Sequence, residues 1–260
     1  MSYATLILGE SGTGKTCSLR NLNPDDVLLI QPVRKPLPFR SGGWREFTAN
    51  TIGDIKNATG SILVCNDAKK ICIAMRHTTK PIVIVDDWQY ILASQFMARR
   101  NERGFDKFTD IGGAGFDIAQ CASELAHNQR VYILAHTQTD ETGQIRIKTL
   151  GKLLDDKVVV EGMFTTVLRT HVDPGANKYV FTTFNCGHDT VKSPMGMFES
   201  SEIDNDLAAI DATICDYYGI EQGQPAQATQ PKPIAKQSKK LGLYENDTHA
   251  LIHEDAGDRI

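Results

Sequence analysis

The sequence predicts an α/β fold with a mostly parallel central sheet. First, short apolar runs with the composition of buried strands are separated by segments whose apolar residues recur at helical spacing. Second, these runs are continuously apolar, as in parallel strands that are covered on both faces. Third, the first run opens directly into a glycine-rich loop. The predicted parallel strands are Tyr3–Leu8, Asp26–Ile30, Ile82–Val85 and Val131–Ala135.

Amphipathic segments between these strands predict helices. Apolar residues share one face in Asp67–Arg76, in Trp88–Arg100 and in Phe116–His127. Asn66 is placed to cap the first of them. Strands that alternate with helices in this way are typical of a parallel α/β sheet.

A different pattern follows residue 157. Met163–Thr170 and Lys178–Phe184 are β-rich runs, and the turn residues Asp-Pro-Gly-Ala-Asn lie between them. This pattern predicts a β-hairpin. Glu202–Tyr218 is amphipathic again and predicts a C-terminal helix. We therefore expect residues 1–220 to form one domain.

The end of the chain has a composition that cannot bury a core. Residues 221–240 are rich in Gln, Pro, Ala and Lys, and residues 241–260 are acidic. We expect 221–260 to be a disordered linker and acidic tail. The alternative is a short partner-binding motif in the tail, formed around Leu243, Tyr244, Leu251 and Ile252.

Charge and cysteine content exclude several classes of protein. Lys and Arg number 28 against 32 Asp and Glu, a net charge of −4, which argues against a broad nucleic-acid or membrane-surface footprint but leaves room for a small basic patch. The six cysteines form no CxxC pair, so reduced thiols in a cytoplasmic protein are expected rather than a zinc site. No signal peptide and no run of about 18 apolar residues is present, so no membrane association is expected.

The glycine-rich loop carries the strongest motif in the chain. The segment GESGTGKT matches the phosphate-binding pattern G-x-x-x-x-G-K-[ST] in full. Successive backbone N–H groups of such a loop point at phosphates, and the following helix N-terminus favours anions. Lys15 is expected to reach the β- and γ-phosphates, and the Thr16 hydroxyl to bind Mg²⁺. The predicted cofactors are ATP and Mg²⁺, and the predicted nucleotide-binding residues are Gly9, Glu10, Ser11, Gly12, Thr13, Gly14, Lys15, Thr16 and Cys17.

Two acids end the third predicted strand. Asp86 and Asp87 follow Ile82–Val85, at the carboxyl edge where open α/β sheets bind ligands. Asp86 is predicted to hold Mg²⁺, and Asp87 to orient or deprotonate the attacking water. Asp87 has an alternative role as the cap of the next helix. Glu10, inside the loop, is a competing candidate for the base.

The strand Val131–Ala135 is predicted to lie between the loop strand and the acidic strand. Polar residues at the end of such a strand contact the γ-phosphate in P-loop ATPases that use a positioned water. His136, Thr137 and Gln138 occupy this place, and Gln138 is the predicted sensor. The alternative for His136 is a hydrogen-bonded histidine at the sheet edge.

A polar, cation-bearing loop comes next. Arg146, Lys148 and Lys152 are predicted either to contact nucleic-acid phosphates or to reach the γ-phosphate of a neighbouring subunit. The alternative is a solvated hairpin without such a role.

Beyond the phosphate loop, the chain carries more particular sequence blocks: IVIVDDWQYI, GFDKFTDIG, HTQTDETGQIRIKTLGKLLDDK, EGMFTTVL and KSPMGMFESSEIDNDL. With these blocks the chain resembles the RecA-like P-loop ATPases of tailed phages and prophages, close to the Sak-type single-strand-annealing ATPases, over residues 5 to about 218. The resemblance implies a RecA-like core that binds ATP and Mg²⁺. It also implies a role on single-stranded DNA in phage recombination, annealing, repair or replication, beside a single-strand-binding protein or another recombination partner, in the host cytoplasm.

The chain departs from this family pattern in two ways. RecA-type recombinases usually have a distinct glutamate base, whereas here the strand ends in Asp-Asp. This implies weak activity or a base elsewhere. The chain also begins at the loop strand, so we expect no N-terminal polymerisation domain, and an expected homo-oligomer would assemble through the core or the tail.

We consider four candidate functions, in order of preference. The first is an ATPase acting on single-stranded DNA, and the second is a non-hydrolysing nucleotide switch or loader that recruits a DNA-processing partner. The third is a small-molecule phosphotransferase, which usually brings an Arg-rich lid that the sequence does not show. The fourth is a DNA-packaging motor, which usually has a nuclease domain and a longer chain.

Overall fold

The computed structural model describes all residues except 151–153, 155–156 and 222–260. Lys152 and the predicted tail therefore lie outside the described residues. The domain boundary at residue 220 and the disorder of 221–260 stay predictions.

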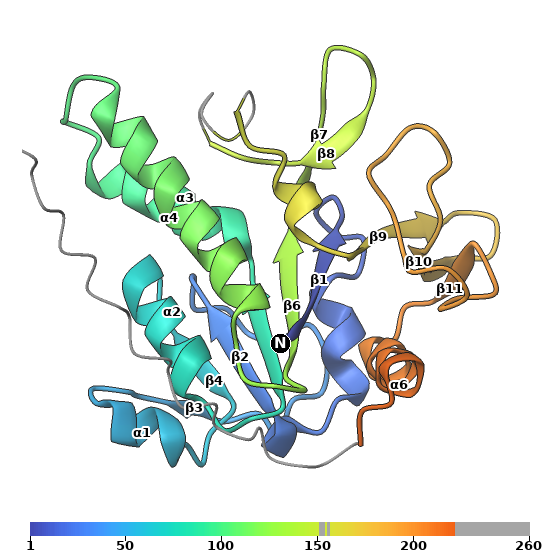
Figure 1. Ribbon diagram of the computed structural model, residues 1–260, viewed down its shortest axis with the longest axis horizontal. Coiled ribbons are helices and arrows are strands. Elements are labelled where there is room, and N and C mark those ends of the chain that lie inside the picture. Colours follow the sequence, from blue (N-terminus) through green and yellow to red (C-terminus); the bar gives the residue numbers. More distant parts are fainter. Residues whose placement is uncertain (151–153, 155–156, 222–260) are drawn as a thin grey trace, which may run out of the picture. The chain divides into compact units, whose positions relative to one another are not determined.

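A nine-stranded sheet forms the centre of the fold, in the order β11-β10-β9-β1-β6-β5-β2-β4-β3 (Figure 1). From β9 to β3 neighbouring strands are parallel, whereas β10 and β11 are added antiparallel at one edge. The predicted α/β class with a mostly parallel sheet and a C-terminal hairpin is confirmed. The strands are β1 (Tyr3–Leu8), β2 (Val27–Gln31), β3 (Glu46–Phe47), β4 (Ile62–Val64), β5 (Ile82–Asp86), β6 (Arg130–Ala135), β9 (Thr166–Asp173), β10 (Lys178–Thr182) and β11 (Glu202–Asp204).

The placement of β6 decides the topology of the core. This strand pairs in parallel with β1 on one side and with β5 on the other. The extra strand predicted between the loop strand and the acidic strand is therefore present. A phosphate loop after β1, acids at the end of β5 and one strand between them define the predicted RecA-like P-loop NTPase core.

Helices cover both faces of the sheet (Figure 1). Because side chains of a strand alternate between faces, Leu6 and Leu8 point to one apolar cluster and Ile7 to the other. The first cluster receives α2 (Ala68–His77), α3 (Trp88–Ala98) and α4 (Asp106–Ser123). The second receives the 3₁₀ helix η1 (Thr16–Asn21) and α6 (Leu207–Tyr218). The remaining short elements are η2 (Pro24–Asp26), α1 (Ile52–Lys56) and η3 (Val160–Met163).

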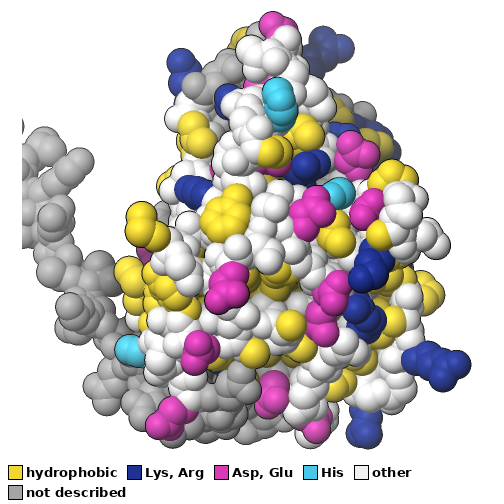
Figure 2. Space-filling model, turned by 90° about the vertical axis from the view of Figure 1, so that its right-hand side faces the viewer, with side chains coloured by type: hydrophobic (Ala, Val, Ile, Leu, Met, Phe, Trp, Pro, Cys, Tyr) yellow, Lys and Arg dark blue, Asp and Glu magenta, His cyan; other side chains and the backbone are white. Residues whose placement is uncertain are grey.

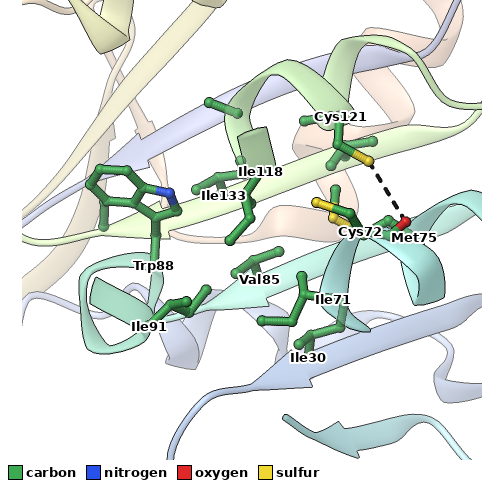
Figure 3. Close-up of a cluster of buried hydrophobic side chains, with 14 of the residues drawn as sticks. Ile30, Ile71, Cys72, Met75, Val85, Trp88, Ile91, Ile118, Cys121 and Ile133 are labelled. Carbon is green, nitrogen blue, oxygen red and sulfur yellow. Dashed lines mark hydrogen bonds between the residues drawn. The ribbon is translucent and has the colours of Figure 1, made fainter. Parts of the chain in front are cut away.

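The first cluster contains the largest buried side chains of α3 and α4 (Figure 3). Trp88 is fully buried, and its indole Nε1 donates to the Gly115 carbonyl at 3.3 Å. Cys121 donates to the Cys72 carbonyl at 3.8 Å, across the contact of α4 with α2. None of the six cysteines, all of which lie among the described residues, is part of a disulfide.

The helix predicted over Phe116–His127 runs over Asp106–Ser123 instead. Gly112, Gly113 and Gly115 lower its helix propensity, so the sequence pattern hides its first half. Packing explains one of these glycines. A Cβ on Gly115 would lie 2.8 Å from Trp88 and 2.9 Å from Leu92, so the close approach of α3 to α4 requires glycine there.

The helix expected after the phosphate loop is present as the six-residue 3₁₀ helix η1. Two further expectations about helices were wrong in detail. Asp67, not Asn66, caps α2, by accepting from the Lys70 N–H at 3.0 Å. Residues 202–204 form β11, because they pair with β10, and the last helix begins only after its cap Asp206.

A buried ion pair joins α6 to β6. Arg130 donates through two nitrogens to the Asp211 carboxylate, each at 3.0 Å, and the Tyr132 hydroxyl donates to it at 2.6 Å. All three side chains are buried. Burial is also the main cause that raises the pKa of Tyr132, so the phenol stays a donor.

We expect Asp211→Ala to lower the free energy of unfolding by about 3–5 kcal/mol, because it leaves the Arg130 charge buried without its partner. Urea unfolding would measure this. Asp216→Ala, an exposed acid on the same helix, is the control and should change stability by less than about 0.5 kcal/mol. Equal shifts for both variants would contradict the role of the pair.

A small second sheet extends from the end of β6. It pairs β7 (Thr137–Thr139) antiparallel with β8 (Ile145–Ile147). Within the described part of the chain, no helix has the length and apolar character needed to cross a membrane.

Candidate functional site

The phosphate-binding loop links β1 to η1, and Lys15 lies folded back on it. The Lys15 Nζ donates to the Gly9 carbonyl at 2.8 Å and to the Glu10 carbonyl at 2.9 Å. Burial lowers the pKa of Lys15, and the nearby Asp87 and Asp86 carboxylates oppose this shift. The Lys15 ammonium therefore lies at the loop, where rotation of the side chain would bring it to an anion bound there.

Thr16 and Asp86, the two predicted metal ligands, lie in contact. The Thr16 hydroxyl lies 3.0 and 3.1 Å from the two carboxylate oxygens of Asp86. Burial raises the pKa of Asp86, while the Lys35 ammonium, 3.7 Å away, lowers it. A hydroxyl and a buried carboxylate side by side are hard oxygen ligands, so the residues present fit Mg²⁺.

Asp87 lies beside His136 at the ends of adjacent strands. Its Oδ2 is 2.6 Å from the His136 Nε2, and the side chain is 3% exposed. Its Oδ1 is buried and has no hydrogen-bond partner among the described residues. Asp87 occupies the cap position of α3 but makes no capping hydrogen bond with its side chain. The Asp87 carboxylate therefore does not cap α3, which was the alternative role predicted for it. The peptide bond between Asp86 and Asp87 is cis.

Lys15, Thr16, Asp87 and His136 line one cavity of about 280 Å³ at the loop, whereas Asp86 contacts Thr16 but is not part of the lining. Its lining brings together loop residues, the second acid and His136 with residues from two other segments: Ser11, Gly12, Gly14, Lys15, Thr16, Cys17, Lys35, Pro38, Asp87, His136 and Tyr179. Three larger cavities, of about 790, 640 and 340 Å³, lie away from the loop, beside α2. None of the three is lined by the phosphate loop, so cavity size does not identify the candidate site.

Some predicted site residues lie outside this lining. Glu10 is exposed, and it contributes its carbonyl to Lys15 rather than its carboxylate to the cavity. Gln138 and Thr137 lie on β7, so His136 is the member of the predicted sensor that reaches the cavity. The roles of Glu10 as base and Gln138 as sensor stay predictions.

Of the residues of the predicted cationic loop, Arg146 lies on β8 and Lys148 directly follows this strand, at the base of the β7–β8 hairpin. Arg146 pairs with Asp140 at 2.9 Å within the hairpin, whereas the Lys148 side chain is exposed. The backbone N–H of Lys148 donates to the His136 carbonyl at 2.7 Å. The hairpin is thus attached directly to the residue that contacts Asp87.

Strand β9 supports the loop from its other side. The Thr170 hydroxyl lies 2.7 Å from the Thr13 hydroxyl and 3.3 Å from the Leu8 carbonyl. A Cβ on Gly9 would lie 2.1 Å from the Thr170 oxygen. This contact explains why the first loop position must be glycine in this fold.

Sequence reasoning missed four residues of the site. Lys35 and Pro38 follow β2, whose carboxyl end lies at the same sheet edge as that of β5, so their position after a parallel strand was an available signal. Tyr179 lines the cavity and Asn205 lies against Gly14. Both come from the antiparallel edge of the sheet, and no local pattern indicates that this edge reaches the loop.

Comparisons with known proteins show only distant likeness. No family model matches the chain, and no curated protein matches it. Among solved structures, the genome packaging NTPase of Sulfolobus turreted icosahedral virus 2 in complex with ATP-gammaS is 13% identical, with a TM-score of 0.34 over 68% of this chain and 78% of that chain. The same viral NTPase in complex with AMPPCP is 11% identical, with a TM-score of 0.35 over 68% and 78%. A KaiC-like protein from Pyrococcus horikoshii OT3 is 10% identical, with a TM-score of 0.38 over 69% and 76%. Likeness at this level assigns neither an activity nor a substrate to this chain.

Proposed function

We propose that this protein is a Mg²⁺-dependent ATPase. The observation that carries the proposal is that three contacts meet at one cavity: Lys15 with the loop carbonyls, Thr16 with Asp86, and Asp87 with His136. Each contact would supply one requirement of phosphoryl transfer. Lys15 is the mobile cation, Thr16 and Asp86 are the metal ligands, and Asp87 is the positioned carboxylate.

The loop binds the phosphates in this proposal. Its backbone N–H groups and Lys15 hold the β- and γ-phosphate oxygens, and Lys15 exchanges its two carbonyl partners for them. Thr16 and Asp86 would hold Mg²⁺, which neutralises the charge on the phosphate chain when bound. Lys35 would leave Asp86 as the metal binds, because two cations compete for that carboxylate.

Asp87 is the proposed base. Its free Oδ1 accepts a proton from the attacking water, while His136 fixes the carboxylate through Oδ2. The water oxygen forms a bond to the γ-phosphorus, and the bond from that phosphorus to the bridging oxygen breaks. ADP and inorganic phosphate leave, and the proton passes from Asp87 to solvent.

We further propose that the ATPase acts on single-stranded DNA through the β7–β8 hairpin. Lys148 is exposed on it, and the hairpin is fixed to His136 and, through the Ile147 N–H, to the buried Glu161 carboxylate at 2.9 Å. A shift in the position of Asp87 can therefore be transmitted to Lys148. It would pass through the Asp87–His136 contact and then through the hydrogen bond from the Lys148 N–H to the His136 carbonyl. Figure 2 looks onto another face, that of β10, β11 and α6, where acidic and basic side chains are interspersed. Because the net charge of the chain is −4, the proposed contact with DNA is confined to this cationic segment. A role in phage recombination or annealing beside a single-strand-binding protein, in a homo-oligomer, rests on the sequence resemblance.

The double change Lys148→Ala, Lys152→Ala tests the DNA contact. Each phosphate contact on a single strand contributes about 0.7 to the slope of log K against log salt, so the slope should flatten by about 1.4. Fluorescence anisotropy with a labelled oligonucleotide at several salt concentrations measures this. ATP affinity should stay at the wild-type value, and Lys56→Ala, Lys69→Ala is the control, since both residues are exposed lysines on other elements.

Unchanged DNA binding together with lost ATP hydrolysis at high protein concentration would contradict the assignment. It would instead place the lysines at a neighbouring subunit's nucleotide.

A nucleotide switch that does not turn over is the second candidate. The observation that favours it is that the strand ends in two aspartates, with the second one held by His136 rather than free on both oxygens. Steady-state phosphate release with and without single-stranded DNA separates the two functions. Stimulation by DNA supports the ATPase, and binding without turnover supports the switch.

A further inference from the structure

One end of the loop cavity is formed by an aromatic ring that the proposed hydrolysis does not use. Tyr179 lies on β10, lines the cavity together with Ser11, Gly12 and Gly14, and is 48% exposed. A Cβ on Gly14 would lie 3.0 Å from the Tyr179 ring. The ring therefore packs directly against the phosphate loop and leaves about half of its surface open.

The sheet order places this ring opposite the hydrolytic groups. Asp87 and His136 follow β5 and β6, on one side of the loop strand β1, whereas Tyr179 lies on β10, on the other side of β1. A nucleotide with its terminal phosphate at Asp87 and His136, and with its other phosphates along the loop toward Tyr179, would place its nucleoside beside the ring.

Asn205 adds a polar group beside the ring. The residue is 3% exposed, and both amide atoms are buried without a hydrogen-bond partner among the described residues. Each amide atom lies 3.2 Å from the position of a Cβ on Gly14. The Asn205 backbone N–H donates to the Tyr179 carbonyl at 3.3 Å, and its carbonyl accepts from Arg20, so the amide and the ring are held together.

An amide with two unpartnered atoms in this position is costly to bury and needs a partner. It offers one donor and one acceptor side by side. Adenine presents the complementary pair, an amino donor next to a ring-nitrogen acceptor, and an Asn side chain binds it through two hydrogen bonds. On the N7 edge guanine presents two acceptors, O6 and N7, so the amide would make only one of the two hydrogen bonds there.

We propose that Tyr179 and Asn205 form an adenine subsite, in which the Tyr179 ring stacks on the base and the Asn205 amide recognises its edge. The inference rests on the proposed function, because the phosphate loop must hold the rest of the nucleotide. It assigns nucleotide selectivity to the antiparallel edge of the sheet, and it gives ATP preference over GTP.

Isothermal titration of the full chain with MgATP, MgGTP and Mg-tripolyphosphate tests the subsite, because tripolyphosphate lacks a base. Stacking on an aromatic ring is worth a factor of about 5 to 100 in affinity, so Tyr179→Ala should lose that much for ATP and nothing for tripolyphosphate. Tyr179→Phe keeps the ring and should bind ATP as the wild type does. Tyr217→Ala, a similarly exposed tyrosine at 42% on α6, is the control and should change neither ligand.

Asn205→Ala should reduce the preference for ATP over GTP by a factor of about 5 to 100 while leaving tripolyphosphate affinity unchanged. Equal losses for ATP and tripolyphosphate in either variant would overturn the subsite, since the residue would then support the loop itself. Unchanged ATP affinity in both variants would also overturn it. If the wild-type chain binds tripolyphosphate and ATP with equal, weak affinity, the adenine subsite is refuted but the proposed function is not. If the folded wild-type chain binds neither ligand, the proposed function itself is refuted.

Discussion

Replacing Asp87 by Asn is expected to lower the turnover number for ATP hydrolysis by about 10²–10⁴-fold, because a general base typically contributes that factor. The affinity for MgATP should stay near the wild-type value. Asparagine keeps the shape of the side chain and can still accept from His136, but it cannot take a proton from water. Phosphate release at saturating ATP gives the turnover number, and isothermal titration gives the affinity.

Asp86→Asn is the matched variant, since it makes the same chemical change one residue earlier. Asp86 contacts Thr16 and would lose a metal ligand charge, so Mg²⁺-dependent binding should weaken as well as turnover. If Asp87→Asn turns over at the wild-type rate, Asp87 is not the base and Glu10 becomes the residue to test. If both variants lose binding equally, the division of roles between the two acids is wrong.

Lys15→Ala should raise the dissociation constant for MgATP at least about 100-fold. Hydrogen bonds to charged groups contribute about 1.5–3 kcal/mol each, and the variant loses those to two phosphates. The fold should remain intact, because Lys15 bonds only to the Gly9 and Glu10 carbonyls and burial disfavours its charge. Titration calorimetry and thermal melting should be measured on the same samples.

Lys56→Ala, an exposed lysine on α1, is the control for the loss of one positive charge. Unchanged nucleotide affinity in Lys15→Ala would contradict the assignment of the loop as the site that binds the nucleotide phosphates. A large drop in melting temperature would show that the lysine stabilises the loop in the absence of nucleotide.

The sequence predicted the parts of the fold that depend on local pattern. The strands β1, β2, β5 and β6 are continuously apolar and bounded by turn residues, so composition and period were enough to locate them. The order of β6 between β1 and β5 was also predicted, although from the chemistry expected at its end.

The failures occurred where tertiary contacts override local preference. The helix α4 contains three glycines that lower its helix propensity, and one of them, Gly115, allows the helix to pack closely against Trp88. Residues 202–204 belong to an amphipathic pattern but pair with β10 as a strand. In each case the decisive partner is distant in the chain.

Some residues of the candidate site could likewise be predicted from local motifs, whereas others could not. Lys15, Thr16, Asp86 and Asp87 belong to local motifs. The structure places Lys15, Thr16 and Asp87 around one cavity and Asp86 in contact with Thr16. Lys35, Tyr179 and Asn205 come from separate loops and the sheet edge, so only the three-dimensional arrangement identifies them.

The central claim is that the loop, Asp86 and Asp87 hydrolyse ATP. Release of inorganic phosphate from ATP by the full chain, with Mg²⁺ or with EDTA and with single-stranded DNA present throughout, tests it most directly. The account predicts Mg²⁺-dependent release by the wild type that is lost in Asp87→Asn and in Lys15→Ala. A folded wild-type chain that binds MgATP but releases no phosphate would contradict it.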